Sequence, residues 1–361
     1  MERKYDLISL GEPLLRLSPP GFRQIRVADS FDVRIVGSQL NVAANCARLG
    51  MNTAFLTKLP DSPLGELVLD NCRAYGVDAS HIKLITGAKM GATYVEFSVA
   101  PRAPKAIYDR AGSAASTVST CDFDWEKLAA QTSCLYTDGI FPGLSASCWE
   151  STMAFIAAGR SNGCLTGFDL NYREHLWNPE TARSVWSEIL PDIDILVINR
   201  NVSELVFGYR GSDEELMHRY HDDFGCKEVC FTSRMMDGLQ RGGWQSKALS
   251  DGKIYYGTDR EFDIVDRYGT GDAWFSGLLC GYLSKGIQYG LDLGNAVCAL
   301  AHTVEGDIIS FSRPDAESIM NGSIELRIDT KTKSHFLLPG SLCSWHDGVV
   351  PLSKRIVVDH G

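Results

Sequence analysis

The sequence predicts an α/β protein with a mainly parallel central sheet covered by helices on both faces. Two observations predict this fold class. Short apolar segments recur along the chain, each ending in small or polar residues, and segments of helical length lie between them. Strands that alternate with helices favour a parallel sheet whose two faces are both buried. A chain of 361 residues, 44% of them hydrophobic, is long enough for one large domain of this kind.

The expected elements follow from the apolar periodicity in chain order. Strands are expected over residues 5–11, 53–59, 133–139, 164–171, 194–200 and 228–233. Helices are expected over residues 63–75, 145–160, 179–190 and 213–224. Ligands of parallel sheets bind beyond the carboxyl ends of the strands. The stretches LGE, TDGIFP, DLNYR and INRN fall at such ends, so they are candidates for a binding site.

Two segments depart from this alternation of strands and helices. Residues 14–35 and 91–111 contain extended pieces with alternating polar and apolar side chains, as in ATYVEFSV and KAIYDRAG. We expect them to form a small β-lid on a domain that spans residues 1–322. Because such short pieces are marginally stable alone, we expect a homodimer or dimer-based assembly formed through the lid. The pattern of residues 323–361 assigns this tail no role.

Composition and charge exclude several classes of partner. The net charge is −10 and no basic run is present, so neither nucleic acid nor an anionic membrane is an expected partner. No apolar run approaches the roughly 20 residues of a membrane span. The 11 cysteines include no C-x-x-C pair and no zinc-ligand spacing. Reduced, buried thiols and a cytoplasmic protein are expected.

The stretch DRYGTGDAWFSG contains the strongest candidate for a catalytic site. Gly269 and Gly271 allow the backbone to aim successive amides at one point, at the start of a helix expected near Ala273. These amides and the helix dipole would bind an anion. Asp272 is then placed to take a proton from a hydroxyl that attacks a bound phosphoryl group. The alternative is that Asp272 only caps the helix.

Small residues at positions 273, 277 and 281 recur on one face of this expected helix. Their size would allow the helix to pack closely against the central sheet.

The stretch DLNYREHLW lies at an expected strand end. Arg173 could bind a phosphate or a carboxylate with two parallel hydrogen bonds, while Asp169 and Asn171 hold the turn. A polar loop with an Asx-type turn is the alternative.

Two further stretches contain candidate binding residues. In VGSQLNVAANCARLG, Gly37 permits the close approach of a ligand and Asn41 opens a helix, where a purely capping role is the alternative. In AIYDRAGSA, Tyr108 and Arg110 lie on the same face of an extended segment. Such a pair could bind a sugar acid, or could simply lie on an exposed edge.

Other nucleotide-binding fingerprints are absent from the sequence. It has no G-x-x-x-x-G-K-[ST] loop, no G-x-G-x-x-G after the first strand and no protein-kinase catalytic loop.

The order of the motifs resembles that of the ribokinase-like carbohydrate kinases, the phosphofructokinase-B family, over about residues 5–322. The shared order is a G-x-x-x-N helix start, a β-insert, a D-x-N-x-R strand end and a G-x-G-D helix. The stretches GEPLLRLSPPG, TKLPDSPLG, IYDRAGSA and DLNYREHLW are similar to those of bacterial 2-keto-3-deoxygluconate kinases.

This resemblance implies a role for each matching residue. Asp272 would be the general base, beside an anion hole formed by Gly269, Thr270 and Gly271. The implied substrate contacts are Gly37, Ser38, Asn41, Tyr94, Tyr108, Arg110, Arg173 and Asp307. The implied nucleotide contacts are Asn171, Asn199 and the loop from Thr232 to Gly238, together with Gly269 and Gly271.

The resemblance also implies a reaction. The γ-phosphate of ATP would move to a primary hydroxyl of a sugar acid, with 2-keto-3-deoxygluconate as the first candidate. The implied cofactors are ATP and Mg²⁺, with K⁺ as a further candidate, and no metal ligand is assigned. A kinase for a neutral sugar such as fructose or ribose is one alternative. A catalytically weakened, sugar-binding member of the fold is another.

Four positions depart from the family pattern. Ser38 replaces the second glycine of the sugar-binding pair, and Val202 replaces an acidic residue that is linked to Mg²⁺. Met235 stands where a glycine is usual in the nucleotide loop, and the bulky Arg267 follows Asp266. All four bear on the rate and on the choice of sugar.

Overall fold

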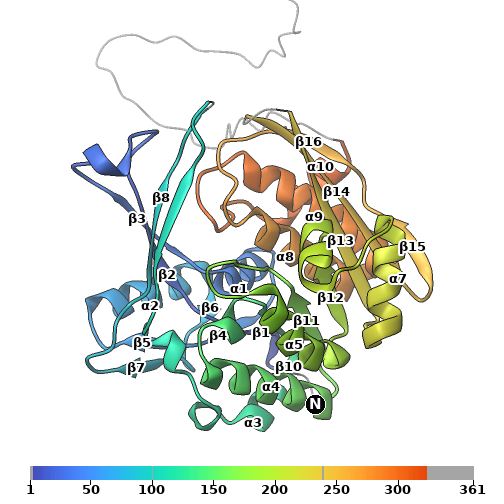
Figure 1. The fold of residues 1–361 in the computed structure, drawn as a ribbon, viewed down its shortest axis with the longest axis horizontal. Helices are drawn as coiled ribbons and strands as arrows, with labels where there is room; N and C mark the ends of the chain where they lie inside the picture. Colours follow the sequence, from blue (N-terminus) through green and yellow to red (C-terminus); the bar gives the residue numbers. More distant parts are fainter. Residues whose placement is uncertain (1–2, 100, 238–239, 323–361) are drawn as a thin grey trace, which may run out of the picture. The chain divides into compact units, whose positions relative to one another are not determined.

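The computed structural model describes residues 3–99, 101–237 and 240–322 (Figure 1). In this part of the chain, the central sheet has ten strands, in the order β15-β14-β13-β12-β11-β10-β1-β4-β6, with β16 paired to β14. The strands are β1 (Tyr5–Leu10), β4 (Thr53–Leu56), β6 (Val77–Asp78), β10 (Thr132–Asp138), β11 (Leu165–Asp169), β12 (Ile195–Ile198), β13 (Glu228–Asp237), β14 (Arg241–Ser250), β15 (Lys253–Tyr256) and β16 (Arg260–Asp263). Pairing is parallel from β6 to β13 and antiparallel beyond it.

All six expected strands are present, but two of them differ from the prediction. The segment over residues 53–59 divides into β4 in the central sheet and β5 (Lys58–Pro60) in a separate two-stranded sheet. The last expected strand is longer than predicted. Strand β13 continues to Asp237 and pairs with β14 from Glu228↔Ser250 to Asp237↔Arg241. The prediction of a nucleotide loop beginning at Thr232 is therefore wrong, because antiparallel pairing keeps this backbone extended. Gly238 and the tail over residues 323–361 lie outside the described residues.

Helices cover both faces of the central sheet, which confirms the predicted fold class. They are α1 (Ser38–Arg48), α2 (Pro63–Tyr75), α3 (Trp125–Ala129), α4 (Ala146–Ser161), α5 (Pro179–Ile189), α6 (Arg200–Val202), α7 (Asp213–Phe224), α8 (Thr270–Lys285), α9 (Ile287–His302) and α10 (Arg313–Met320). Alternate residues of β12 point to opposite faces. Ile195 and Val197 pack with α8 and α9, whereas Leu196 and Ile198 pack with α5 and α7.

The four expected helices are α2, α4, α5 and α7, and their sequences explain where they begin. Asn178 caps α5 by accepting from the Thr181 amide, and proline follows at the first helical position. Ser212 and Glu215 form a reciprocal capping box at the start of α7.

Helices α8 and α9 pack against each other through glycines. A Cβ atom on Gly277 would lie 2.8 Å from the Cα of Gly294, and one on Gly281 would lie 2.6 Å from the Cα of Gly290. The expectation that this face of α8 packs on the sheet is therefore wrong for positions 277 and 281. The second helix occupies that position because two glycine faces let the backbones approach each other directly.

The two departing segments form a separate sheet, the β-lid, in the order β3-β2-β8-β9. Its strands are β2 (Leu14–Ser18), β3 (Asp32–Val36), β8 (Ala92–Glu96) and β9 (Lys105–Asp109). Figure 1 shows these blue and cyan strands extending beyond the helices that cover the central sheet. A further two-stranded sheet pairs β5 (Lys58–Pro60) with β7 (Lys83–Ile85). The extended structure predicted for both segments is confirmed.

The described residues contain no helix that is both long and apolar enough to cross a membrane. The ten cysteines in these residues are all free, and nine of them are buried.

We expect Gly277→Val to lower the free energy of unfolding by about 1–3 kcal/mol or more, because its side chain would overlap the α9 backbone. Urea denaturation followed by circular dichroism measures this change. Leu283→Ala is the matched control on α8, since Leu283 is 39% exposed, and its effect should stay within about 0.5 kcal/mol. Equal stability of Gly277→Val and the unmodified protein would contradict the close packing of α8 on α9.

Candidate active site

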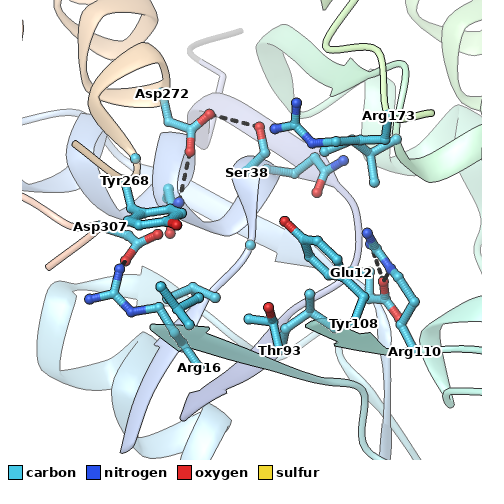
Figure 2. Close-up of a pocket in the computed structure, with 18 residues that line it drawn as sticks. Glu12, Arg16, Ser38, Thr93, Tyr108, Arg110, Arg173, Tyr268, Asp272 and Asp307 are labelled. Atoms are coloured by element: carbon cyan, nitrogen blue, oxygen red, sulfur yellow. Dashed lines mark hydrogen bonds and ion pairs between the residues drawn. The ribbon is translucent and has the colours of Figure 1, made fainter. Parts of the chain in front are cut away.

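Two cavities meet at the carboxyl ends of the central strands. The lid pocket has a volume of about 110 Å³ and is lined by Glu12, Leu14, Arg16, Val36, Gly37, Ser38, Gln39, Asn41, Thr93, Val95, Tyr108, Arg110, Ile140, Arg173, Tyr268, Gly269, Asp272 and Asp307 (Figure 2). The strand-end pocket has a volume of about 690 Å³ and is lined by Asp169, Asn171, Tyr172, Arg173, Val197, Asn199, Arg200, Asn201, Val202, Asp213, Phe231, Thr232, Ser233, Arg234, Trp244 and Gly271. Arg173 lines both cavities.

The first turn of α8 lies where the two pockets meet. Gly269 caps the helix in the left-handed conformation, with φ of 69°. A Cβ atom there would lie 2.4 Å from the Asp307 carbonyl oxygen, so only glycine fits. The helix begins at Thr270, earlier than expected, and Asp272 lies inside the first turn. Asp272 is therefore not the N-cap, and the capping alternative is wrong.

Two side chains from α1 hold the Asp272 carboxylate. Ser38 Oγ donates to Oδ1 at 2.8 Å, and Asn41 Nδ2 donates to Oδ2 at 2.7 Å. Burial raises the pKa of Asp272 to about 7, against the opposing effect of these two hydrogen bonds. A carboxylate with this pKa can accept a proton near neutral pH, as a general base requires.

The start of α1 differs from the prediction made for Asn41. Gly37 is the N-cap, and Asn41 lies one turn inside the helix. A Cβ atom on Gly37 would lie 2.4 Å from the Glu12 carbonyl oxygen, so this glycine permits close approach to the chain's own backbone. The side-chain oxygen of Asn41 is buried and has no partner among the described residues. A hydroxyl group bound in the lid pocket could satisfy it.

A hydrogen-bond network links Asp272 to the end of β11. Asn171 has a positive φ of 34° and donates through Nδ2 to Ser38 Oγ at 3.1 Å and to Asp138 Oδ2 at 2.8 Å. Because Ser38 accepts from Asn171, its own proton points to Asp272. The serine that replaces the usual glycine thus connects Asp272 to Asn171. The backbone amide of Asn171 also donates to Asp169 Oδ1 at 2.9 Å.

Asp138 and Asp169 add two more carboxylates beside this network. Asp138 is fully buried and also accepts from the Gln39 side chain and the Ile140 amide. Burial is the main cause that raises the pKa of Asp169 to about 7, and the charge of Asp138 adds to it. The region therefore favours cations or neutral donors next to these carboxylates.

Arg110 is not the open guanidinium that the sequence suggested. It lies 8% exposed, donates through Nε to Glu12 Oε2 at 2.7 Å and forms an ion pair with that carboxylate (Figure 2). Burial raises the pKa of Glu12, while Arg110 and the Ser113 hydroxyl oppose that rise. Much of the positive charge of Arg110 is thus neutralised inside the protein.

Asp307 is also paired, in this case with an arginine that the sequence reasoning missed. The buried Arg16 forms ion pairs with Asp307 and, at 3.3 Å, with Asp266. Burial raises the pKa of Asp307 to about 7 despite Arg16.

Arg173 has no ion-pair partner among the described residues. Its only hydrogen bond in this part of the chain is to the Tyr172 carbonyl oxygen, at 3.2 Å. Figure 2 shows its side chain extending toward Ser38 and Asp272. Of the arginines in the lid pocket, it is the one available to an anionic ligand.

The lid contributes one of its two predicted tyrosines to the pocket. The Tyr108 ring stacks on His175 with centroids 4.4 Å apart, which joins β9 to the loop after β11. Tyr94 is different, because Thr93 and Val95 of β8 line the pocket and the intervening side chain points to the other face. It packs against Phe31 instead, so the assignment of Tyr94 to the pocket is wrong.

The expected nucleotide contacts Asn171, Asn199, Thr232 and Gly271 line the strand-end pocket. Thr270 does not, since it is buried. Asn199 caps α6 by accepting from the Val202 amide at 3.0 Å.

The sequence contained a signal for two missed carboxylates. Glu12 and Asp138 belong to LGE and TDG, which fall at the ends of β1 and β10. Arg16 carried no such signal, because only the folded lid brings it beside Asp266 and Asp307.

Comparisons with known proteins identify the family. The model of the pfkB family of carbohydrate kinases matches residues 22–314. The chain is 34% identical to the 2-dehydro-3-deoxygalactonokinase of Haloferax volcanii, over 88% of this chain and 97% of the relative. It is 28% identical to the 2-dehydro-3-deoxygluconokinase of Thermoproteus tenax, over 88% and 95%.

Among solved structures, the 2-dehydro-3-deoxygluconokinase of Thermotoga maritima superposes with a TM-score of 0.84 and 31% identity, covering 88% of this chain and 99% of that one. The glycine-capped start of α8, the buried Asp272 and the β-lid therefore occur in a chain that belongs to the pfkB family of carbohydrate kinases.

Proposed function

We propose that this carbohydrate kinase transfers the γ-phosphate of ATP to the primary hydroxyl of a 2-keto-3-deoxy sugar acid in the cytoplasm. The observation that carries the proposal is the position of Asp272, which two donors from α1 hold in the lid pocket at the first turn of α8. Gly271 of the same turn faces the strand-end pocket. A hydroxyl on one side and a phosphate chain on the other would meet at this turn.

The proposed mechanism assigns each pocket one substrate. The sugar occupies the lid pocket, where Asn41 and Asp307 bind its hydroxyls and Asp272 accepts the proton of the attacking one. ATP occupies the strand-end pocket, with its terminal phosphates at the amides of the first α8 turn. Positioning of the two groups and neutralisation of charge supply most of the rate in such a transfer.

Arg173 supports an acidic sugar. It lines the lid pocket and has no ion-pair partner among the described residues, so its guanidinium would form direct hydrogen bonds with a substrate carboxylate. Arg110 would add its remaining donor, Nη1. One relative named above is a 2-dehydro-3-deoxygalactonokinase and another is a 2-dehydro-3-deoxygluconokinase. We therefore propose the shared 2-keto-3-deoxy acid, and the assay distinguishes its two configurations.

A neutral ketose is the second candidate substrate. The ion pair between Glu12 and Arg110 favours it, because this pair leaves the lid end of the pocket with little net charge.

Mg²⁺ would accompany ATP as the charge-neutralising ion. In the described part of the chain, no three His, Cys, Asp or Glu side chains gather as a metal site. Mg²⁺ bound with nucleotides usually needs only one or two carboxylates besides phosphates and water. Asp169 fits this need, since it lines the strand-end pocket and Val202 supplies no carboxylate. K⁺ remains a candidate that rests on the family resemblance.

We expect Asp272→Asn to lower kcat by about two decades or more, the scale of a lost general base, while ATP and sugar still bind. Steady-state assays of ADP release and calorimetry measure the two effects.

In the unmodified enzyme, kcat/KM should fall as the pH drops below about 7, because protonated Asp272 accepts no proton. Ser38→Ala removes a bond that lowers this pKa, so the acid limb should move to higher pH. Normal turnover of Asp272→Asn would exclude Asp272 as the base.

We expect Arg173→Gln to raise the KM for a 2-keto-3-deoxy acid by about tenfold or more, as for a lost bond to a charged group, and to affect a neutral sugar far less. The assay uses 2-keto-3-deoxygluconate, 2-keto-3-deoxygalactonate, fructose and ribose. Arg183→Gln on the exposed surface of α5 is the control. If the enzyme phosphorylates fructose efficiently and neither of the two acids, a neutral ketose replaces the sugar acid as the proposed substrate.

We also propose a homodimer formed through the β-lid. All five residues of β9 are exposed, and Ile107 and Val33 are 54% and 51% exposed, so an apolar lid face is available to a second copy. Light scattering at micromolar concentration should give twice the chain mass. Ile107→Asp should shift the mass toward the monomer, and a monomeric unmodified protein would contradict the proposal.

A further inference from the structure

Three arginines line the strand-end pocket, and they differ in what already neutralises them. Arg200 forms an ion pair with Asp213 and also donates to the Gly211 carbonyl oxygen. Arg173 also lines the lid pocket, where the proposed function uses it. Arg234 lines only the strand-end pocket and has no carboxylate partner among the described residues.

Two contacts hold the Arg234 side chain in a defined place. Its Nη2 donates to Thr270 Oγ1 at 2.9 Å, and its guanidinium carbon lies 5.3 Å from the centroid of the Trp244 ring. Thr270 is the first residue of α8, and its hydroxyl in turn donates to the Arg267 carbonyl oxygen at 3.0 Å. The guanidinium is therefore fixed beside the helix turn that carries Gly271 and Asp272.

The surroundings of Arg234 favour an anion. Although its side chain is exposed to the open pocket, the surrounding protein lowers the pKa of its guanidinium by desolvation. The charges of Arg267 and Arg173 lower this pKa further, whereas the charge of Asp272 opposes the fall. Positive groups thus accumulate beside the α8 N-terminus, whose amides also attract negative charge. A bound phosphate would relieve this repulsion.

We propose that Arg234 is a catalytic residue that binds the phosphate chain of ATP at the bond that breaks. The inference rests on the proposed function for the direction of transfer. Arg234 belongs to the nucleotide side of the α8 turn, whereas Asp272 belongs to the sugar side. Its target is therefore the oxygen between the β- and γ-phosphorus atoms and the β-phosphate that leaves with ADP.

The step balances without any further reactant. The sugar oxygen forms a bond to the γ-phosphorus atom and its proton passes to Asp272, while the bond from the γ-phosphorus atom to the bridging oxygen breaks. The electron pair of that bond stays on ADP, where negative charge grows in a loose transition state. Arg234 stabilises this growing charge, so it should affect kcat more than the affinity for ATP.

The position of Arg234 could also serve only to attach β13 to α8 through Thr270. The two roles predict different kinetics. An attaching role would change stability and weaken the binding of both substrates, whereas a catalytic role changes kcat and leaves sugar binding intact.

The test compares Arg234→Gln, Arg234→Lys and the control Arg241→Gln. Arg241 lies on the paired strand β14 in an exposed ion pair with Glu261. We expect Arg234→Gln to lower kcat by about 10²–10³, the loss typical of one removed charge-stabilising donor. The KM for ATP and the sugar Kd without nucleotide should change less than tenfold. Arg234→Lys should recover part of kcat because it restores the charge but not the fork of donors.

A kcat of Arg234→Gln within threefold of the unmodified enzyme overturns the proposal. Equal losses of stability and of both substrate affinities overturn it too. Calorimetry keeps the test separate from the identity of the sugar, because it needs no turnover. In the calorimetric experiment, Arg234→Gln should bind ADP and a non-hydrolysable ATP analogue more weakly than the unmodified protein does, whereas the affinity for AMP should not change. Equal binding of all three nucleotides by both proteins would contradict a contact at the β-phosphate.

Discussion

The site depends on the contact between the first turns of α1 and α8. Ser38 and Asn41 donate from α1 to the Asp272 carboxylate of α8. Each bond to a charged acceptor is worth about 1.5–3 kcal/mol, so the two bonds stabilise both the Asp272 carboxylate and the junction of the two helices. One turn later, the Ser276 hydroxyl donates to the Asp272 carbonyl oxygen of its own helix at 2.7 Å and lies 3.4 Å from the Val42 carbonyl oxygen of α1.

The close packing of α8 on α9 fixes the direction in which the first turn of α8 points. Glycines at positions 277 and 281 meet glycines at 294 and 290, so the two backbones are in contact and α8 has little freedom to shift. Gly269 then places the start of α8 against the Asp307 carbonyl group. The amides proposed to bind an anion are thus positioned by the core and not by a flexible loop, as electrostatic stabilisation requires.

The chain carries a net charge of −10, yet as a carbohydrate kinase it must bind the phosphate chain of a nucleotide. The arginines of the site differ in whether a carboxylate already neutralises them. Arg16 and Arg110 are neutralised by carboxylates at the two ends of the lid pocket (Figure 2). Arg173 and Arg234 have no ion-pair partner among the described residues and lie beside the α8 turn. Two guanidinium groups without a direct ion pair in this part of the chain thus lie near the buried carboxylates of Asp138, Asp169 and Asp272.

The sequence by itself determined the fold class, the six parallel strands and the boundaries of α2 and α7. Local periodicity and capping residues decide such elements, so no distant contact is needed to predict them. It also indicated Asp272 as the candidate base, because the stretch GTGD places two glycines, a threonine and an aspartate within one helical turn. The pairing that extends β13 and the glycine contacts of α8 were decided by the tertiary structure. Both depend on segments that are distant in the sequence.

Only the tertiary structure decided the electrostatic partners at the site. Glu12 neutralises Arg110 from 98 residues away, and Arg16 reaches Asp307 across 291 residues. The orientation of Tyr94 depended on the register of β8, since a shift by one residue reverses the face of every side chain. Residue types and their order indicated the chemistry. The folded chain decides which of the charged side chains are paired with each other and which can contact a substrate, because it brings residues together that are distant in the sequence.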